Sequence, residues 1–144
     1  MPYEVYRGNA LDAYDRWLSP NLIISDGAYG LGIFDGEPKN TSGLADWYAP
    51  HVDAWTRLAL PSTTLWLWNC ERGWPHVHRL LEDAGWLYRE TTVWNKGVQH
   101  IAGKVNSNTI RTLPVVTEIA VRYTRKLAFV KKWRCRCVAG LYAS

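Results

Sequence analysis

The sequence predicts an α/β domain in which helices flank a mostly parallel β-sheet. Apolar runs rich in β-branched and aromatic residues alternate along the chain with stretches whose apolar residues recur at helical spacing. Strand, helix and strand follow one another repeatedly, which is the order that builds parallel sheets. The 144 residues suffice for one domain with an ordinary core, and 47% hydrophobic against 21% charged residues is typical of a globular chain.

The first predicted strand-helix-strand unit lies at the N-terminus. The alternating run 3–6 predicts a short strand, and Asn9 is a suitable N-cap for a helix over 10–18. A Ser-Pro pair ends this helix, and the apolar run 22–24 predicts the next strand.

The middle of the chain predicts a loop, a helix and a strand. Residues 35–43 are polar and rich in Gly, Pro, Asn and Ser, so we expect a mobile loop. The helical pattern covers 44–60, where Pro50 is expected to kink the helix or divide it in two. The run 62–69 is β-branched and aromatic and predicts a buried strand.

The last part of the predicted domain contains a helix, two strands and a long loop. A helix over 75–84 is expected to end at Gly85, and the strand 86–94 follows. Residues 96–114 are polar, and a loop of this length inside a compact domain is usually functional or disordered. The run 115–123 predicts the final strand.

Charge and composition narrow the class of protein. Residues 1–121 carry 10 Lys and Arg against 13 acidic residues, a net charge of −3, whereas residues 122–144 carry seven Lys and Arg and no acid. No apolar run approaches the roughly 18 residues that span a bilayer, and no signal-peptide pattern opens the sequence. We therefore expect a cytoplasmic protein without a membrane partner. Three cysteines argue against a disulfide framework, and the His and Cys spacing predicts no metal site.

The stretch 22–34 is the most informative about function. Its apolar run ends in Asp26, the small residues Gly27 and Ala28 follow, and Tyr29 comes next. Because parallel sheets bind ligands beyond the carboxyl ends of their strands, these residues are a candidate site. A carboxylate beside an aromatic ring suits a planar nitrogenous ring: Asp26 would accept a hydrogen bond from an exocyclic amino group, and Tyr29 would stack on the ring. The glycines nearby do not match the dinucleotide pattern G-x-G-x-x-G.

Three segments of the sequence resemble the DNA amino-methyltransferases, which methylate adenine N6 or cytosine N4. Residues 26–29, Asp-Gly-Ala-Tyr, resemble a degenerate form of the family's Asp-Pro-Pro-Tyr motif. Residues 7–12 resemble the Gly-Asp-x-Leu segment that precedes that motif, and residues 118–126 resemble the late strand that follows the family's variable region. The resemblance extends from about residue 3 to residue 126 in the expected order.

The resemblance implies a Rossmann-like methyltransferase fold that acts on double-stranded DNA with S-adenosylmethionine (SAM) as cofactor. The target base would be flipped out of the duplex into a pocket. There Asp26 and the Gly27 carbonyl would hold its amino group while Tyr29 stacks on its ring. The catalytic residues implied are Asp26, Gly27, Ala28 and Tyr29.

The resemblance also implies residues that contact the cofactor and the duplex. The cofactor would be held by Gly8, Asn9, Ala10 and Asp26. The loop 96–114 would be the target-recognition region, where basic groups position the duplex through its phosphates. Its candidate DNA contacts are Lys96, His100, Lys104 and Arg111, for which a solvated loop is the alternative.

Two features depart from the family's pattern. Gly27 and Ala28 replace the double proline, which makes the loop costlier to order by roughly 0.5–1 kcal/mol per residue. The glycine-rich Phe-x-Gly-x-Gly segment expected after residue 126 has no match in the remaining residues. We therefore expect 1–126 to be a partial catalytic domain with an incomplete fold, and 127–144 to be an atypical basic tail. One hypothesis is a truncating frameshift, since one back-translation of 131–138 read two bases later encodes Glu-Met-Glu-Val-Pro-Val.

The predicted function is site-specific DNA methylation, as in restriction-modification, or that of an inactive remnant of such an enzyme. Two alternatives stay open: a non-catalytic α/β nucleic-acid-binding module, and a methyltransferase that acts on RNA or a small molecule. A second copy of the chain or a complementing fragment is a further expected partner. The sequence does not choose between adenine and cytosine.

Overall fold

The computed structural model describes residues 3–97 and 117–125. The predicted DNA contacts His100, Lys104 and Arg111 and the basic tail lie outside these ranges. The strands are β1 (Leu22–Asp26), β2 (Thr64–Asn69), β3 (Leu87–Asn95) and β4 (Thr117–Thr124). The helices are α1 (Leu44–Leu58) and α2 (Trp74–Asp83), and three short 3-10 turns are η1 (Ala10–Asp12), η2 (Tyr14–Arg16) and η3 (Thr41–Gly43).

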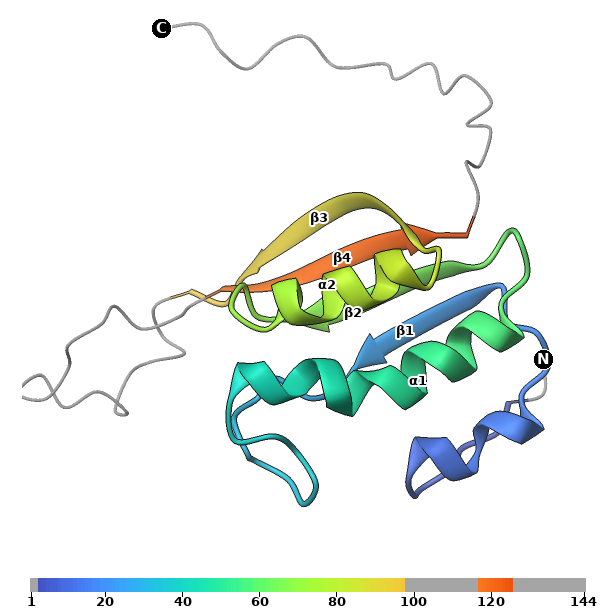
Figure 1. The fold of residues 1–144 in the computed structure, drawn as a ribbon, viewed down its shortest axis with the longest axis horizontal. Coiled ribbons are helices and arrows are strands. Elements are labelled where there is room, and N and C mark those ends of the chain that lie inside the picture. Colours follow the sequence, from blue (N-terminus) through green and yellow to red (C-terminus); the bar gives the residue numbers. More distant parts are fainter. Residues whose placement is uncertain (1–2, 98–116, 126–144) are drawn as a thin grey trace, which may run out of the picture.

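The four strands form one mixed sheet in the order β1-β2-β4-β3 (Figure 1). β1 and β2 pair in parallel, with Leu22 opposite Thr64 and Asp26 opposite Trp68. β4 pairs antiparallel with both β2 and β3. The prediction of a mostly parallel sheet is therefore wrong. Helical connections keep β1, β2 and β3 pointing the same way, but β4 inserts between β2 and β3 and reverses the direction of both of its pairs.

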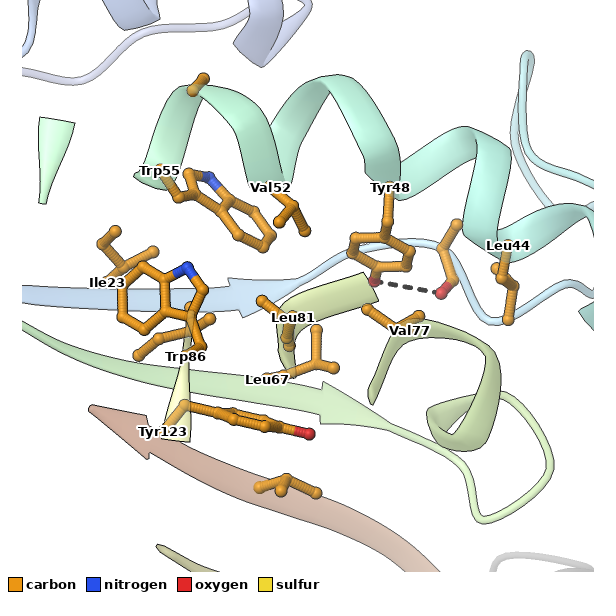
Figure 2. Close-up of a cluster of buried hydrophobic side chains, with 14 of the residues drawn as sticks. Ile23, Leu44, Tyr48, Val52, Trp55, Leu67, Val77, Leu81, Trp86 and Tyr123 are labelled. Atoms are coloured by element: carbon orange, nitrogen blue, oxygen red, sulfur yellow. Dashed lines mark hydrogen bonds between the residues drawn. The ribbon is translucent and has the colours of Figure 1, made fainter. Parts of the chain in front are cut away.

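Both helices pack on one face of the sheet and close a single core (Figure 2). The helices bury an apolar stripe against alternate strand residues, because side chains at every second position of a strand share one face. The residues that meet there are Ile23, Leu44, Tyr48, Val52, Trp55, Leu65, Leu67, Val77, Leu81, Val121 and Tyr123. Fully buried Trp86, just before β3, joins them and donates its indole N–H to Thr56 Oγ1 at 2.9 Å.

The opposite face of the sheet carries exposed apolar side chains. Leu22 and Ile24, which alternate with buried Ile23 along β1, are 52% and 66% exposed. Among the described residues, neither α1 nor α2 covers this face. None of the helices in the described ranges is long and apolar enough to cross a membrane.

The N-terminal segment differs from its prediction. Residues 3–6 form no strand. Tyr3 and Val5 are 89% and 83% exposed, so pairing as a strand would not be stabilised by burial of their side chains. The helix expected over 10–18 is replaced by the separate turns η1 and η2. Asn9 nevertheless caps the first turn as predicted, since its side-chain oxygen accepts a hydrogen bond from the Leu11 N–H at 3.1 Å.

The remaining elements lie close to their predicted positions. α1 runs as one helix through Pro50, so the expected division in two does not occur. Gly85 follows α2 with φ of 83°, the left-handed conformation that glycine adopts easily at the end of a helix. β1 and β2 thus end side by side, and the loop after β1 starts at that shared edge.

Candidate functional site

The site is built on Asp26 and Tyr29, which the structure brings into direct contact. Asp26 is the exposed last residue of β1, opposite Trp68 in β2. The chain turns so that the Tyr29 hydroxyl donates a hydrogen bond to Asp26 Oδ1 at 2.8 Å. Burial of the ring, and then the Asp26 carboxylate, raise the pKa of Tyr29 far above its ordinary value, so the phenol stays protonated and neutral.

The Ala28 carbonyl fixes the loop to the neighbouring elements. This fully buried residue accepts hydrogen bonds from Asn69 Nδ2 at 3.0 Å and from the Tyr48 hydroxyl at 3.2 Å. The Tyr48 bond is the dashed line in Figure 2. Burial raises the pKa of Tyr48 to about 12, so its hydroxyl remains a donor at neutral pH. Ala28, predicted to be catalytic, therefore serves in this structure to hold the loop between β2 and α1.

Gly27 explains one departure from the Asp-Pro-Pro-Tyr pattern. A Cβ atom at this position would lie 2.8 Å from the Tyr48 hydroxyl oxygen and 3.2 Å from the Trp47 ring. The backbone runs so close to these two side chains of α1 that a larger residue would displace them. A proline here would meet the same obstacle, so the glycine matches the packing of this particular chain.

Glu37 organises the glycine-rich loop, a role that was not predicted from the sequence. Its carboxylate accepts four backbone N–H groups: Tyr29 at 2.7 Å, Gly30 at 3.1 Å and Leu31 at 3.3 Å on Oε1, and Ile33 at 2.6 Å on Oε2. Residues 35–43, expected to be a mobile loop, therefore contain the group that orders residues 29–33. The signal that could have revealed it is an acid directly after three glycines within seven residues.

The pKa of Glu37 reflects two opposed effects. Burial, which leaves the residue 8% exposed, would raise the pKa of the carboxyl because it disfavours the charged form. The four N–H donors act in the other direction and outweigh burial, so the pKa lies below its ordinary value. Glu37 is therefore ionised at neutral pH.

A cavity of about 500 Å³ opens beside Tyr29 at the ends of the strands. Its walls come from the loop after β1, the turn after β2 and the adjoining ends of β3 and β4. Tyr29, Arg72, Lys96 and Glu118 give it aromatic and charged walls. The cavity thus offers a ring surface and both signs of charge to a polar, planar ligand.

Lys96 and Glu118 form an ion pair in this cavity. Lys96 Nζ lies 2.6 Å from Glu118 Oε1, with side-chain exposures of 16% and 19%. The Trp68 indole donates to Glu118 Oε2 at 3.0 Å. Burial raises the pKa of Glu118, but Lys96 and Trp68 outweigh it and lower the pKa below its ordinary value. A contact between Lys96 and DNA stays a prediction, and it requires a phosphate to replace Glu118 as the partner.

Three of the four predicted cofactor residues lie together in a second cavity of about 660 Å³. Gly8, Asn9 and Ala10 form one wall, and the aromatic rings of Phe34 and Trp47 are part of the other. Aspartates 35 and 46 also line it. Asp26, the fourth, lies instead in an adjoining cavity of about 270 Å³, which shares Ala10, Trp47 and His51 with the larger one.

Comparison with known proteins identifies the fold. No protein-family model and no curated protein matches the chain. The crystal structure of the M1.HpyAVI-SAM complex matches 84% of this chain and 54% of that chain, with a TM-score of 0.54 and 18% identity. A second crystal structure of M1.HpyAVI matches 84% and 52%, with a TM-score of 0.51 and 20% identity. The chain shares the fold of these two structures. It spans about half the length of these solved structures.

One of the two larger cavities contains Tyr29 and the other contains Gly8 to Ala10. Asp26 is connected to both: it accepts the Tyr29 hydroxyl, and its own cavity shares Ala10 with the cavity of Gly8 to Ala10.

Proposed function

We propose that the chain forms the base-binding part of a SAM-dependent DNA methyltransferase that acts on adenine N6 or cytosine N4. The observation that carries the proposal is the contact between Asp26 and Tyr29 at the end of β1, in a methyltransferase fold. Catalysis in such a site is mainly positioning and electrostatics, because no covalent intermediate with the protein is required.

Asp26 and Tyr29 have separate tasks in this proposal. The exocyclic amino group of a flipped base donates a hydrogen bond to Asp26, which draws the amino nitrogen toward tetrahedral geometry and makes its lone pair available. A carboxylate has about four acceptor positions, so Asp26 can receive this bond while it keeps the Tyr29 hydroxyl. The neutral Tyr29 ring stacks on the base, and the Gly27 carbonyl accepts the second amino proton.

The residues around Gly8 to Ala10 fit the adenosine part of SAM. The Phe34 and Trp47 rings, whose centroids lie 6.2 Å apart, offer aromatic surface. Asn9 offers polar atoms for an adenine edge. SAM supplies an electrophilic methyl group when bound. Asp26, in the adjoining cavity, would hold the acceptor nitrogen on the side that faces this ligand.

The proposal extends to the duplex that presents the base. Lys96, His100, Lys104 and Arg111 belong to the target-recognition region 96–114, and their charges would position the DNA through its phosphates. Removal of Lys96 is expected to weaken binding to all sequences alike and to reduce the salt dependence by about one phosphate contact.

Two measurements on the full chain test the proposal. Calorimetry measures SAM binding, and transfer of a labelled methyl group from SAM to unmethylated duplex DNA measures activity. Asp26→Ala should reduce transfer by about 100-fold or more while SAM affinity changes little. The matched control Asp83→Asn removes an exposed carboxylate and should change neither. Equal transfer by wild type and Asp26→Ala contradicts the assignment. Absent SAM binding with retained DNA binding favours the non-catalytic nucleic-acid-binding module instead.

A further inference from the structure

We propose that Glu37 is a positioning residue for Tyr29: its carboxylate fills an anion site formed by the loop's own backbone and so holds the stacking ring in place before a base arrives. This inference rests on the proposed function, because it assigns Glu37 a part in base binding. The Glu37 carboxylate binds backbone N–H groups of the loop and so acts on Tyr29 through the backbone.

The loop backbone forms a concave array of N–H groups. Gly30 and Gly32 have φ of 78° and 63°, and this alternation turns the amides of the loop toward one point. Successive N–H groups arranged in this way form an anion-binding concavity. A Cβ on Gly30 would lie 2.7 Å from the backbone of Asn40, so the second half of the loop closes tightly over the first.

The anion in this concavity is supplied by the protein itself. Glu37 lies eight residues after Tyr29 and is 8% exposed, and its two oxygens accept all four converging amides. Two backbone bonds close the same loop: Gly32 N donates to the Pro38 carbonyl and Glu37 N to the Phe34 carbonyl, each at 3.1 Å. The glycine-rich loop is therefore filled internally and does not present its amides to a phosphate.

The consequence for Tyr29 is found in one peptide group. The peptide between Ala28 and Tyr29 has its carbonyl held by Asn69 and Tyr48, and its N–H held by Glu37 at 2.7 Å. Both polar atoms of this peptide are thus fixed, by β2 and α1 on one side and by the loop on the other. This fixes the position of the Tyr29 Cα, and the hydrogen bond from the Tyr29 hydroxyl to Asp26 fixes the ring at its other end, so the ring direction is set by folding and not by the ligand. Binding to such a preorganised ring avoids the cost of ordering it.

The test uses NMR of the full chain, with amide hydrogen exchange and titration with deoxyadenosine as the probe. In the wild type we expect slow exchange of the four bonded amides and a shift of the Tyr29 ring signals on titration. Glu37→Gln retains one carbonyl oxygen as an acceptor. Its NH₂ group, which is a donor, then faces an N–H group that the second carboxylate oxygen accepted in the wild type. The variant should accelerate exchange at residues 29–33 and weaken the Tyr29 response by about tenfold. Glu37→Asp keeps the anion with a shorter reach and should restore part of both.

Glu4→Gln is the matched control, because the Glu4 side chain is 75% exposed and its ion pair with Arg16 is long, with 3.6 Å between Glu4 Oε1 and Arg16 Nη1. It should leave both readouts at their wild-type values. If Glu37→Gln leaves the Tyr29 response to deoxyadenosine unchanged, the inference fails while base binding stands. If the wild type shows no Tyr29 response to deoxyadenosine or, in a second titration, to deoxycytidine, the proposed function and the inference fall together. If Glu37→Gln does not fold, Glu37→Asp decides: fast amide exchange with a fully wild-type Tyr29 response, or slow exchange with a lost response, also overturns the inference.

Discussion

The two sides of the proposed site are held in very different ways. On the base side, Asp26, the Ala28 carbonyl and the Tyr29 N–H each have a hydrogen-bond partner, and Glu37 and Asn69 that hold the backbone are buried. On the cofactor side, Gly8 to Ala10 are exposed, and the Asn9 side chain makes one capping bond. The proposed base side is therefore held by buried hydrogen bonds, whereas the proposed cofactor side is exposed to solvent.

The cofactor side nevertheless has one firm attachment. The Tyr14 hydroxyl lies 2.8 Å from His51 Nδ1 and accepts the Trp55 indole N–H at 2.9 Å, so η2 is anchored to α1. Burial lowers the pKa of His51, which keeps the imidazole neutral near pH 7. The exposed residues 8–10 precede η2 in the chain and are connected to α1 through it. Four substitutions test the contrast between the two sides, from the largest expected effect to the smallest.

Asn69→Ala should cause the largest loss of stability, about 3 kcal/mol. It removes a fully buried side chain that donates to the Ala28 carbonyl and accepts the Cys70 N–H at 2.9 Å, and it leaves the Cys70 N–H without this acceptor. Urea unfolding measures the change. The control Asn95→Ala removes an exposed amide that accepts one loop N–H, and it should cost less than about 0.5 kcal/mol. Equal costs at the two positions would show that the loop is not held through β2.

Glu37→Gln should cost about 2 kcal/mol at neutral pH, because the part-buried Ile33 N–H loses its charged acceptor. The cost should depend on pH. The folded pKa of Glu37 lies below the unfolded value near 4.5, so its contribution is fully present above that value and is lost as the pH falls through the folded pKa. Unfolding curves of wild type and variant should therefore converge in acid. A difference that stays constant from pH 7 into acid contradicts an ionised Glu37.

Gly27→Ala should cost about 1–2 kcal/mol through the contact of its Cβ with Tyr48 and Trp47. The structure identifies the obstacle, so the effect can be tested for coupling. In a Tyr48→Phe background the hydroxyl 2.8 Å from this Cβ is gone, and the cost of Gly27→Ala should fall. Additive costs in thermal or urea unfolding would mean that the hydroxyl is not the obstacle.

Asn9→Ala should have the smallest effect on folding, about 0.5–1 kcal/mol, because it removes a single exposed capping bond. Its effect should appear instead in SAM affinity measured by calorimetry, while the response of Tyr29 to nucleosides stays unchanged. A loss of the Tyr29 response with intact SAM binding would reverse the assignment of the two sides.

The sequence predicted the elements that have a strong hydrophobic period. β1, α1, β2, α2, β3 and β4 each lie within about three residues of their predicted positions, since burial of one face dictates the pattern. The N-terminal strand failed because Tyr3 and Val5 alternate without any surface to cover. The direction of β4 was missed because periodicity specifies which face is buried and not which strand is the neighbour.

The candidate site was predicted in part. The sequence placed Asp26 and Tyr29 near each other, since only Gly27 and Ala28 lie between them, but it did not predict the hydrogen bond that joins them. The side chains that hold the loop could not be predicted from a local pattern, because Asn69 and Tyr48 lie 41 and 20 residues along the sequence from Ala28, whose carbonyl they bind. Glu37 lay in a stretch whose composition indicated mobility, because side-chain bonds to backbone amides leave no periodic trace in the sequence.

The most direct test of base binding compares nucleosides that differ in the exocyclic amino group. Deoxyadenosine and purine 2′-deoxyriboside, each titrated against the full chain, share a purine ring, but only deoxyadenosine carries an amino N–H that can donate to Asp26. The account predicts that both shift the Tyr29 ring signals and that deoxyadenosine binds more tightly by about tenfold, a preference that Asp26→Ala abolishes. Equal affinity for the two nucleosides in the wild type, or shifts that avoid Tyr29, would contradict it.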